Sequence, residues 1–238
     1  MRIELLDPDL CYLYGDLANV RYLHRCCPEA EIVETHAKDR PAFLDGGVDL
    51  VYMGSATERG LSLAADALRP YREQLAELIA QGQRFLITGN ALDIFGRSIR
   101  SDDGLEIEGL GLFDFHADYR MLKRVSSFFL GDFQGQTVTG FKSLFGYLEG
   151  APETEELFTV RRGVGRNLTS KLEGFRRNNF MGTHLIGPLL VLNPPFTKWL
   201  LKEMGAGDVA LPFEDTAMAA YEKRIAEMAD ETIDYNFH

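Results

Sequence analysis

The sequence predicts an α/β fold in which the sheet is parallel in its N-terminal part and antiparallel later. Apolar strands alternate with amphipathic helical segments up to about residue 96, a pattern typical of a parallel sheet with right-handed crossovers. In the second half, strand-like segments follow one another and are separated by glycine-containing turns. With 238 residues, 45% of them hydrophobic, the chain is long enough to bury a sizeable core. We therefore expect one domain over residues 1–238.

The parallel part is expected to begin with short apolar strands, and a helix follows the first of them. Runs of apolar and β-branched residues predict strands at 1–6, 31–35, 48–53 and 84–88. Asp16 stands where an N-cap is expected for a helix over 17–27, because its side chain can accept a hydrogen bond from a free backbone N–H.

Helical periodicity and glycine turns place the remaining elements. A second helical stretch covers 61–81, and Pro70 either divides it or stands in the first turn of a second helix. The strand at 84–88 turns at Gly89 and Asn90 into a helix that Gly96 ends. Further on, strands are predicted at 125–131, 137–141, 157–161 and 184–190, and a charged amphipathic helix at about 214–229.

Composition argues against several classes of protein. The chain is acidic, with a net charge of -11 and a pI of about 5.0, whereas nucleic-acid-binding domains usually carry a basic stripe. Its basic stretches are short pairs, Arg161-Arg162 and Arg176-Arg177, so we expect no nucleic-acid partner. No apolar run approaches the ~18–20 residues of a membrane span, and no signal peptide is recognised. We therefore expect a cytoplasmic protein with no membrane span, no disulfide framework, no metal and no cofactor.

Two predicted strands end in residues suited to a ligand site, at Gly54-Ser55 and at Gly89-Asn90. In open α/β sheets, ligands bind beyond the carboxyl ends of the strands. A sharp strand-to-helix turn lifts its apex residue above the sheet and directs the following backbone N–H groups at the substrate. Such an elbow usually presents a nucleophile, but its apex here is Gly89. Taken alone, the segment is equally consistent with an ordinary tight turn that uses glycine.

Motifs spread from about residue 7 to about residue 202 occur in an order that a known family shares. They are Tyr14–Val20, Met53–Ser55 with Glu58-Arg59, Ile87–Gly96, Glu108–Asp114, Thr139–Phe141, Gly182–Leu190 and Asn193-Pro194. Together they resemble the cobyric-acid-synthase-like class I glutamine amidotransferases, and among these most closely the glutaminase subunits of lipid II isoglutaminyl synthases. The resemblance implies a flavodoxin-like three-layer sandwich with a mixed sheet.

The resemblance also implies a chemistry. A cysteine on the elbow attacks the glutamine amide, a histidine accepts and returns the proton, and an arginine holds the substrate carboxylate. Backbone N–H groups near the elbow and after an earlier strand form the oxyanion hole. The released ammonia passes to a ligase partner, which in the most similar subgroup is a Mur-ligase-like subunit acting on the cell-wall precursor.

This sequence departs from the family motif at each of those side-chain positions. The family elbow reads Cys-Gly-Gly-Tyr-Gln-(Leu/Phe)-Leu-Gly, and alignment on Gly96 places its cysteine on Gly89. Alignment of Gly-Thr-Tyr-(Leu/Ile)-His-Gly-Pro on Gly187-Pro188 places its histidine on Ile186. The motif Asn-His-Gly-Gly-Arg places its arginine on Tyr147. Loss of a nucleophile in a comparable triad costs on the order of 10⁶-fold in turnover, so we expect glutamine hydrolysis to be lost.

His184 is the residue through which chemistry could have been rebuilt. It stands at the tyrosine of the family motif, two positions before Ile186. Because alternate side chains of a strand share a face, we expect His184 to face the same pocket as Ile186. A pair with the Thr88 hydroxyl is one arrangement, but Thr88 ends its strand and is expected to point into the sheet. The simpler interpretation is a histidine of the pocket wall.

The frame of a ligand pocket is expected to remain. Gly54, Ser55 and Asn90 are expected to offer backbone N–H groups at strand ends, which favour a small polar or anionic ligand. The expected surroundings of that ligand are Gly54, Ser55, Gly89, Asn90, Tyr147 and His184.

Three functions follow from these patterns. The first is a non-catalytic glutaminase-like protein that acts as a partner or ligand-binding subunit, with a Mur-ligase-like enzyme as its partner. The second is an enzyme with altered chemistry in the same pocket that uses His184. The third is an active glutaminase subunit in which the family positions lie elsewhere than Gly89, Ile186 and Tyr147.

Overall fold

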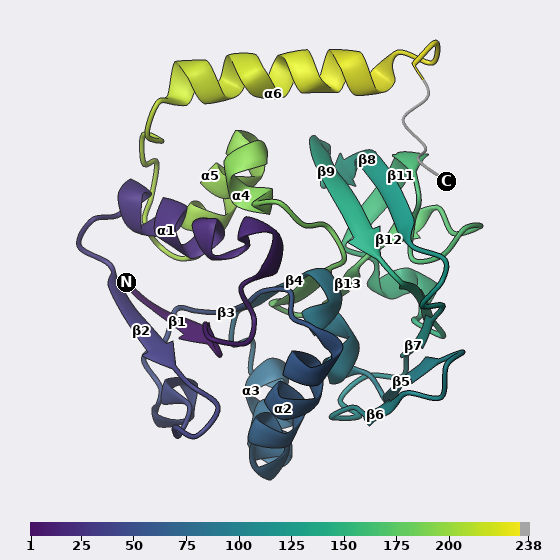
Figure 1. Cartoon of the computed structure of the whole chain (residues 1–238). Coiled ribbons are helices and arrows are strands. Elements are labelled where there is room, and N and C mark those ends of the chain that lie inside the picture. Colours follow the sequence, from purple (N-terminus) through teal and green to yellow (C-terminus); the bar gives the residue numbers. More distant parts are fainter. Residues whose placement is uncertain (234–238) are drawn as a thin grey trace.

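A computed structural model describes residues 1–233 and shows a six-stranded sheet between two layers of helices (Figure 1). The strand order is β13-β14-β4-β3-β1-β2. Neighbouring strands from β14 to β2 are parallel, and the edge strand β13 is antiparallel to β14. The strands are β1 Arg2–Leu6, β2 Glu31–Thr35, β3 Leu50–Met53, β4 Phe85–Thr88, β13 Phe175–Arg177 and β14 Phe180–Thr183. The predicted mixed, flavodoxin-like α/β sheet is confirmed.

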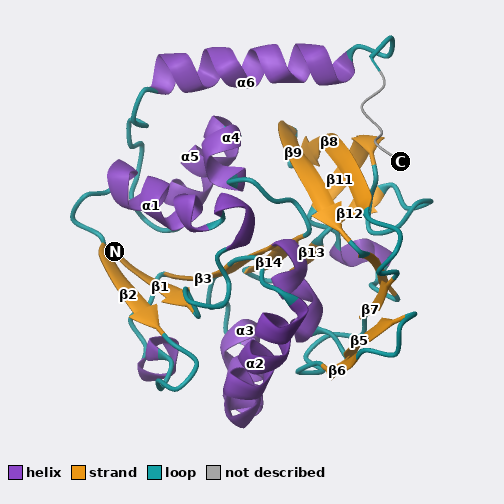
Figure 2. Ribbon diagram, viewed as in Figure 1, coloured by secondary structure: helices purple, strands orange, loops and turns teal. Residues whose placement is uncertain are grey.

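The central strands β3 and β4 are almost entirely apolar and fully buried, as expected where helices cover both faces of the sheet. Along β4, Phe85 and Ile87 pack into one core cluster and Leu86 into the other. The first cluster includes residues of α2 and α3, and the second includes residues of α1, α4 and α5, so the helices form separate layers (Figure 2). The helices are α1 Leu17–Cys26, α2 Glu58–Leu68, α3 Arg72–Ala80, α4 Leu189–Leu192 and α5 Pro194–Glu203.

Two smaller sheets lie beside the central one. The antiparallel sheet β12-β11-β8-β9 contains three of the four strands predicted for the second half, those at 125–131, 137–141 and 157–161. The sheet β10-β7-β5-β6 pairs β5 with β7 in parallel. Their strands are β5 Ser98–Ser101, β6 Glu106–Glu108, β7 His116–Tyr119, β8 Val125–Phe133, β9 Gln136–Leu144, β10 Gly146–Glu149, β11 Phe158–Gly163 and β12 Leu172–Glu173.

The helix α6, Glu214–Ala229, lies across α4, α5 and the ends of β8 and β9 (Figure 1). Tyr221 is its one buried residue, so most of the helix surface is accessible. Short 3₁₀ segments complete the fold, namely η1 Leu13–Gly15, η2 Ala42–Asp45, η3 Arg69–Tyr71, η4 Gly89–Phe95 and η5 Glu153–Glu155. Within residues 1–233, no helix has the length and hydrophobicity needed to cross a membrane.

Several local expectations are corrected by the structure. The helical stretch predicted at 61–81 is divided at Pro70, which was one of the two expected arrangements, whereas the helix expected after the elbow is a 3₁₀ helix. Asp16 precedes α1 but makes no capping hydrogen bond. The strand expected at 184–190 is wrong, because the strand is β14 and the chain turns at Gly187, which has a positive φ of 73°. Pro188 follows, and α4 begins directly after it.

Candidate functional site

The elbow after β4 is built around Gly89, which adopts a positive φ of 62°. This left-handed conformation favours glycine, since a Cβ would approach the following carbonyl. Space is a second constraint. A Cβ at this position would overlap the Ser55 hydroxyl oxygen and lie 2.9 Å from the Ser55 Cβ and 3.2 Å from Cγ2 of Ile186. The apex of the elbow therefore faces Ser55 and Ile186, and the Ser55 hydroxyl fills the volume in which a side chain of residue 89 would begin.

A buried carboxylate holds Ser55 in that place. Asp16 Oδ2 accepts hydrogen bonds from the Ser55 backbone N–H at 2.8 Å, the Ser55 hydroxyl at 2.7 Å and the Thr88 hydroxyl at 3.1 Å. Burial raises the pKa of the Asp16 carboxyl, and the hydrogen bonds from Ser55 oppose that rise. A Cβ on Gly54 would lie 2.8 Å from the Asp16 Cβ, so glycine at this strand end gives Asp16 its room.

The neighbouring backbone groups at the end of β3 are also occupied. The Ala56 N–H donates to Asn90 Oδ1 at 3.0 Å, and Asn90 Nδ2 donates to the Ala56 carbonyl at 2.8 Å. We expected Ser55 to offer its backbone N–H to a ligand, but that group bonds to Asp16 instead. An incoming anion would have to displace a carboxylate from the Ser55 N–H.

A second buried network lies on the other side of the elbow. His184 Nε2 is 2.7 Å from Asp93 Oδ1, and the Tyr119 hydroxyl donates to Asp93 Oδ2 at 2.7 Å. His184 and Asp93 are almost fully buried. Burial raises the pKa of Tyr119, and the charge of Asp93 adds to that rise, so the phenol remains a neutral donor.

The backbone of His184 is held by a buried ion pair. Its N–H donates to Glu173 Oε1 at 3.0 Å, and Lys142 Nζ lies 3.0 Å from the same oxygen. Burial lowers the pKa of Lys142, while the Glu173 charge opposes that shift. These contacts replace the strand hydrogen bonding that we expected at this position, and they fix the imidazole beside Asp93.

A cavity of about 210 Å³ opens above these networks. Four of the expected pocket residues, Ser55, Gly89, Asn90 and His184, line it together with Ile186. Its other lining residues are Leu13, Tyr14, Ala56, Thr57, Glu58, Tyr119, Arg124, Ser143, Leu144 and Phe145. No group of three or more metal-ligating side chains occurs in the described part of the chain.

Two residues expected at the pocket lie outside its lining. Tyr147 is on β10 of the small second sheet, where it pairs with Asp118 of β7, and Phe145 lines the cavity instead. Gly54 is buried against Asp16 and the Cys11 carbonyl. Both residues were expected at the pocket from their sequence motifs. Which residue lines the cavity depends on the direction of the chain after each strand, which the motifs do not contain.

The rim of the cavity carries charges of both signs. The Arg124 guanidinium stacks over the Phe145 ring at 4.8 Å from its centroid, and Glu58 lies at the beginning of α2. Neither side chain forms an ion pair with another described residue, so both can contact a small polar ligand.

Sequence patterns missed the side chains that organise the site. Asp16 was assigned to a helix cap, and Asp93 and Tyr119 were not selected. One signal was present, because the elbow and strand motifs place Asp93 on the glutamine of the family and His184 on its tyrosine. The two substituted positions contact each other. Thr88 and His184 belong to separate networks, so the structure does not bring that pair together.

Comparison with known proteins supports the resemblance to glutamine amidotransferases that the motifs indicated. The model of the CobB/CobQ-like glutamine amidotransferase domain matches residues 2–192. The chain is 28% identical over 210 residues to the lipid II isoglutaminyl synthase (glutamine-hydrolyzing) subunit GatD of Staphylococcus aureus (strain N315). That alignment covers 87% of this chain and 84% of the subunit.

Solved structures share the fold at low identity. A glutamine amidotransferase crystal structure is similar with a TM-score of 0.55 and 13% identity, over 85% of this chain and 98% of that chain. A glutamine amidotransferase from Thermotoga maritima is similar with a TM-score of 0.50 and 10% identity, over 95% of this chain and 94% of that chain. At these identities the likeness concerns the fold alone.

Proposed function

This chain belongs to the CobB/CobQ-like glutamine amidotransferase family, and from that premise we propose that it is a member that no longer hydrolyses glutamine. It acts as a non-catalytic partner or ligand-binding subunit. The observation that carries the proposal is the Ser55 hydroxyl, which fills the volume in which a side chain on Gly89 would begin. The elbow is thus adapted to glycine and has no room for a nucleophile.

The surrounding groups support the same conclusion by their chemistry. Glutamine hydrolysis needs a nucleophile, a group that moves a proton and donors for the oxyanion. Gly89 carries no side chain, and Ile186, which lies beside it, cannot accept a proton. The Asp16 carboxylate occupies the Ser55 N–H. Ionised, it would repel an oxyanion at that donor, and protonated, it would still fill the position.

A partner role extends the proposal. The Staphylococcus aureus relative is a subunit of a synthase, as its name states. We propose a cytoplasmic Mur-ligase-like protein as the partner, in amidation of a cell-wall precursor. Such a ligase would take free ammonia, because this chain would supply none from glutamine.

Glutamate release from glutamine tests the loss of hydrolysis. The purified protein, alone and mixed with a Mur-ligase-like protein of the same organism, is expected to release glutamate no faster than the ligase alone. The matched variant is His184→Ala. Release at an enzymatic rate by the wild-type mixture, abolished by His184→Ala, would overturn the proposal.

The partner role is tested by a separate measurement. Size-exclusion chromatography of the mixture is expected to show one complex, and amidation by the ligase is expected to proceed with ammonium chloride. Independent elution of the two proteins, together with unchanged ligase activity, would contradict the partner role and leave the loss of hydrolysis standing.

A second candidate function is altered chemistry at His184. It is favoured by the Asp93 carboxylate at 2.7 Å from Nε2, which orients an imidazole that lines the cavity. Mass spectrometry of the native protein would then detect a bound small molecule that His184→Gln loses. A protein that purifies without any such molecule, and whose cavity stays empty in a crystal structure, would count against this function.

A further inference from the structure

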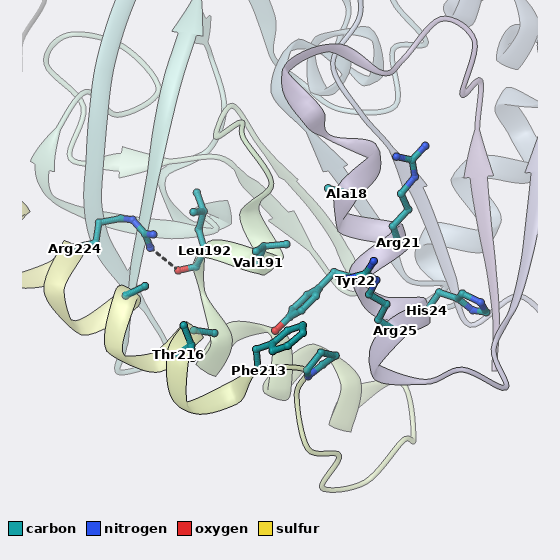
Figure 3. Close-up of a pocket in the computed structure, with 13 residues that line it drawn as sticks. Ala18, Arg21, Tyr22, His24, Arg25, Val191, Leu192, Phe213, Thr216 and Arg224 are labelled. Atoms are coloured by element: carbon teal, nitrogen blue, oxygen red, sulfur yellow. Dashed lines mark hydrogen bonds between the residues drawn. The ribbon is translucent and has the colours of Figure 1, made fainter.

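A second hollow, of about 790 Å³, lies between α1, α4 and α6, away from the elbow (Figure 3). Its floor is apolar, with Val191 and Leu192 of α4 between the two longer helices. Small side chains face it from both sides, Ala18 on α1 and Ala217 and Ala220 on α6. Because alanines cannot bridge the space between the helices, they leave a groove of the size that small-molecule sites have.

Cations without acidic partners surround this groove. Arg21 and Arg25 lie four residues apart on α1, therefore on one face of the helix, and both are exposed. Within residues 1–233, neither guanidinium forms a hydrogen bond or an ion pair. Arg224 of α6 donates to the Leu192 carbonyl at 3.1 Å and forms no direct ion pair among the described residues, although the Glu227 charge on the same helix interacts with it. In a chain of net charge -11, such a group of unpaired cations is selective for anions.

A buried polar atom without a partner among the described residues also indicates a ligand in this groove. The Tyr22 hydroxyl is buried and has no hydrogen-bond partner in the described part of the chain. Figure 3 shows its ring extending from α1 toward Phe213, at the beginning of α6. Burial raises the pKa of Tyr22 to about 12, and the charges of Cys26 and Glu214 add to that rise, so the phenol is a donor at neutral pH. A buried donor without an acceptor costs free energy, which a ligand oxygen would recover.

Phe213 forms the open end of the groove. Its backbone has a positive φ of 54°, an unusual conformation for an aromatic residue, and the residue is 80% exposed. An exposed ring on a strained backbone is characteristic of positions that serve binding. It extends the apolar floor beyond the alanines of α6.

We propose that this groove binds a single-chain anionic amphiphile, with its apolar chain against Val191 and Leu192 and its carboxylate or phosphate head between Arg25 and the Tyr22 hydroxyl. Charge and apolarity together select this occupant, since a neutral apolar molecule would leave the cations and the phenol unpartnered. The α6 wall of the groove lies beyond residues 2–192, the part that the family model matches. The site is therefore independent of the elbow, and the loss of glutamine hydrolysis can fail without affecting it.

Calorimetric titration with dodecyl phosphate, below its micelle concentration, tests the site. Dodecyl phosphate is expected to bind about tenfold or more tightly than dodecyl maltoside, because a charge-assisted hydrogen bond contributes at least ~1.4 kcal/mol. Dodecanoate is expected to bind like dodecyl phosphate, and inorganic phosphate alone is expected to bind too weakly to measure. Equal affinity for the neutral and the anionic amphiphile would overturn the proposal.

Substitutions locate the binding. Arg25→Glu is expected to weaken dodecyl phosphate binding about tenfold, whereas Arg59→Glu, the same charge change on α2, is expected to leave it unchanged. Tyr22→Phe is expected to weaken it less. Ala220→Trp fills the groove from an exposed helix position and is expected to abolish binding at an unchanged melting temperature. Equal weakening by Arg59→Glu, or undiminished binding by Ala220→Trp, would contradict the groove as the site.

A last experiment distinguishes binding of a free amphiphile from binding of lipid head groups on a membrane surface. Vesicles of phosphatidylglycerol are offered to the wild-type and the Ala220→Trp proteins in a sedimentation assay. If the groove binds single amphiphile molecules, the wild-type protein binds dodecyl phosphate monomers and the Ala220→Trp protein does not. Binding to vesicles by both proteins, with no binding of dodecyl phosphate monomers by either, would show a surface interaction and overturn the proposal.

Discussion

The buried polar groups at the elbow are bonded within the chain, whereas the exposed arginines of α1 beside the groove are not bonded to any described residue. At the elbow, Ser55 bonds to Asp16, Asn90 to Ala56, and His184 to Asp93, all within the chain. In the groove, Arg21 and Arg25 make no ion pair within residues 1–233. The first region belongs to the part that the family model matches, and α6 of the second does not.

This difference affects how easily each region can bind a ligand. A pocket whose donors already bond to the chain must break those bonds to bind a ligand, and each unpaired buried group costs ~1–3 kcal/mol. A groove with unpartnered cations gains by binding an anion. Substitutions at the elbow should therefore lower stability, whereas substitutions in the groove should alter binding and leave stability nearly unchanged.

The largest effect is expected at the Asp93–His184 pair. Asp93→Ala removes one partner of a buried pair, which typically costs about 3–5 kcal/mol of unfolding free energy. Urea denaturation measures the loss, and Asp66→Ala on the exposed face of α2 serves as a control with little change. In a double-mutant cycle, Asp93→Ala and His184→Ala are expected to be less than additive. Additive losses would show that the two side chains do not act as a pair.

Next in size is the cost of any side chain on the elbow. Gly89→Ala is expected to destabilise the protein by about 2–4 kcal/mol, from the left-handed backbone and the overlap with Ser55. In a Ser55→Gly background the steric part should disappear and a cost of about 1–2 kcal/mol should remain. If Gly89→Ala unfolds at the same urea concentration as the wild type, the elbow has room for a side chain.

Asp7 differs from the buried polar groups of the elbow, although it also lies in the part of the chain that the family model matches. Its side chain is buried but makes no hydrogen bond within residues 1–233, and burial raises its pKa from 3.8 to about 6. Asp9 and Asp39 add to the rise, and His36 opposes it. Since the folded protein binds this proton more tightly than the unfolded chain, Asp7 lowers stability as the pH rises from about 4 through about 6.

Asp7→Asn removes that penalty. We expect the variant to gain about 1–2 kcal/mol relative to the wild type on going from pH 4 to pH 7, which is less than the full shift implies because water screens part of it. Thermal unfolding at the two pH values measures this. A stability difference that does not change with pH would show that Asp7 titrates normally.

The smallest effect is expected in the groove. Arg25→Glu should change the unfolding free energy by no more than about 1 kcal/mol, because the side chain is exposed and unpaired and its charge acts only on the C-terminal end of α1. The same variant is expected to weaken dodecyl phosphate binding. A stability loss comparable with that of Asp93→Ala would erase the distinction between the two regions.

Local patterns were sufficient for much of the fold. The strands β1, β2 and β4 were predicted close to their observed ends, because short runs of apolar and β-branched residues can be recognised in the sequence. The short strands of the second sheet were not predicted, since three or four residues carry too little periodicity. The strand expected at 184–190 failed because the segment reads as apolar whether it forms a strand, a turn or a short helix.

The site could be predicted in position but not in organisation. The elbow and His184 were identified from motifs, and the structure places them at one cavity. Asp16 was assigned to a helix cap because aspartate before a helix usually serves that role. Its partner Ser55 lies 39 residues away, and the room left by Gly54 decides the contact. No local pattern contains that information.

By itself, the sequence determined that the chain is an α/β protein with a glycine at the apex of its elbow. A glycine carries no side-chain nucleophile in any packing, but the structure was needed to place Gly89 at the turn beside Ile186. Only the tertiary structure decided that Ser55 fills the space above Gly89, that His184 meets Asp93 from 91 residues away, and that α6 closes a groove against α1. Periodicity records which residues are buried, whereas the partner that each buried group meets depends on how distant segments pack.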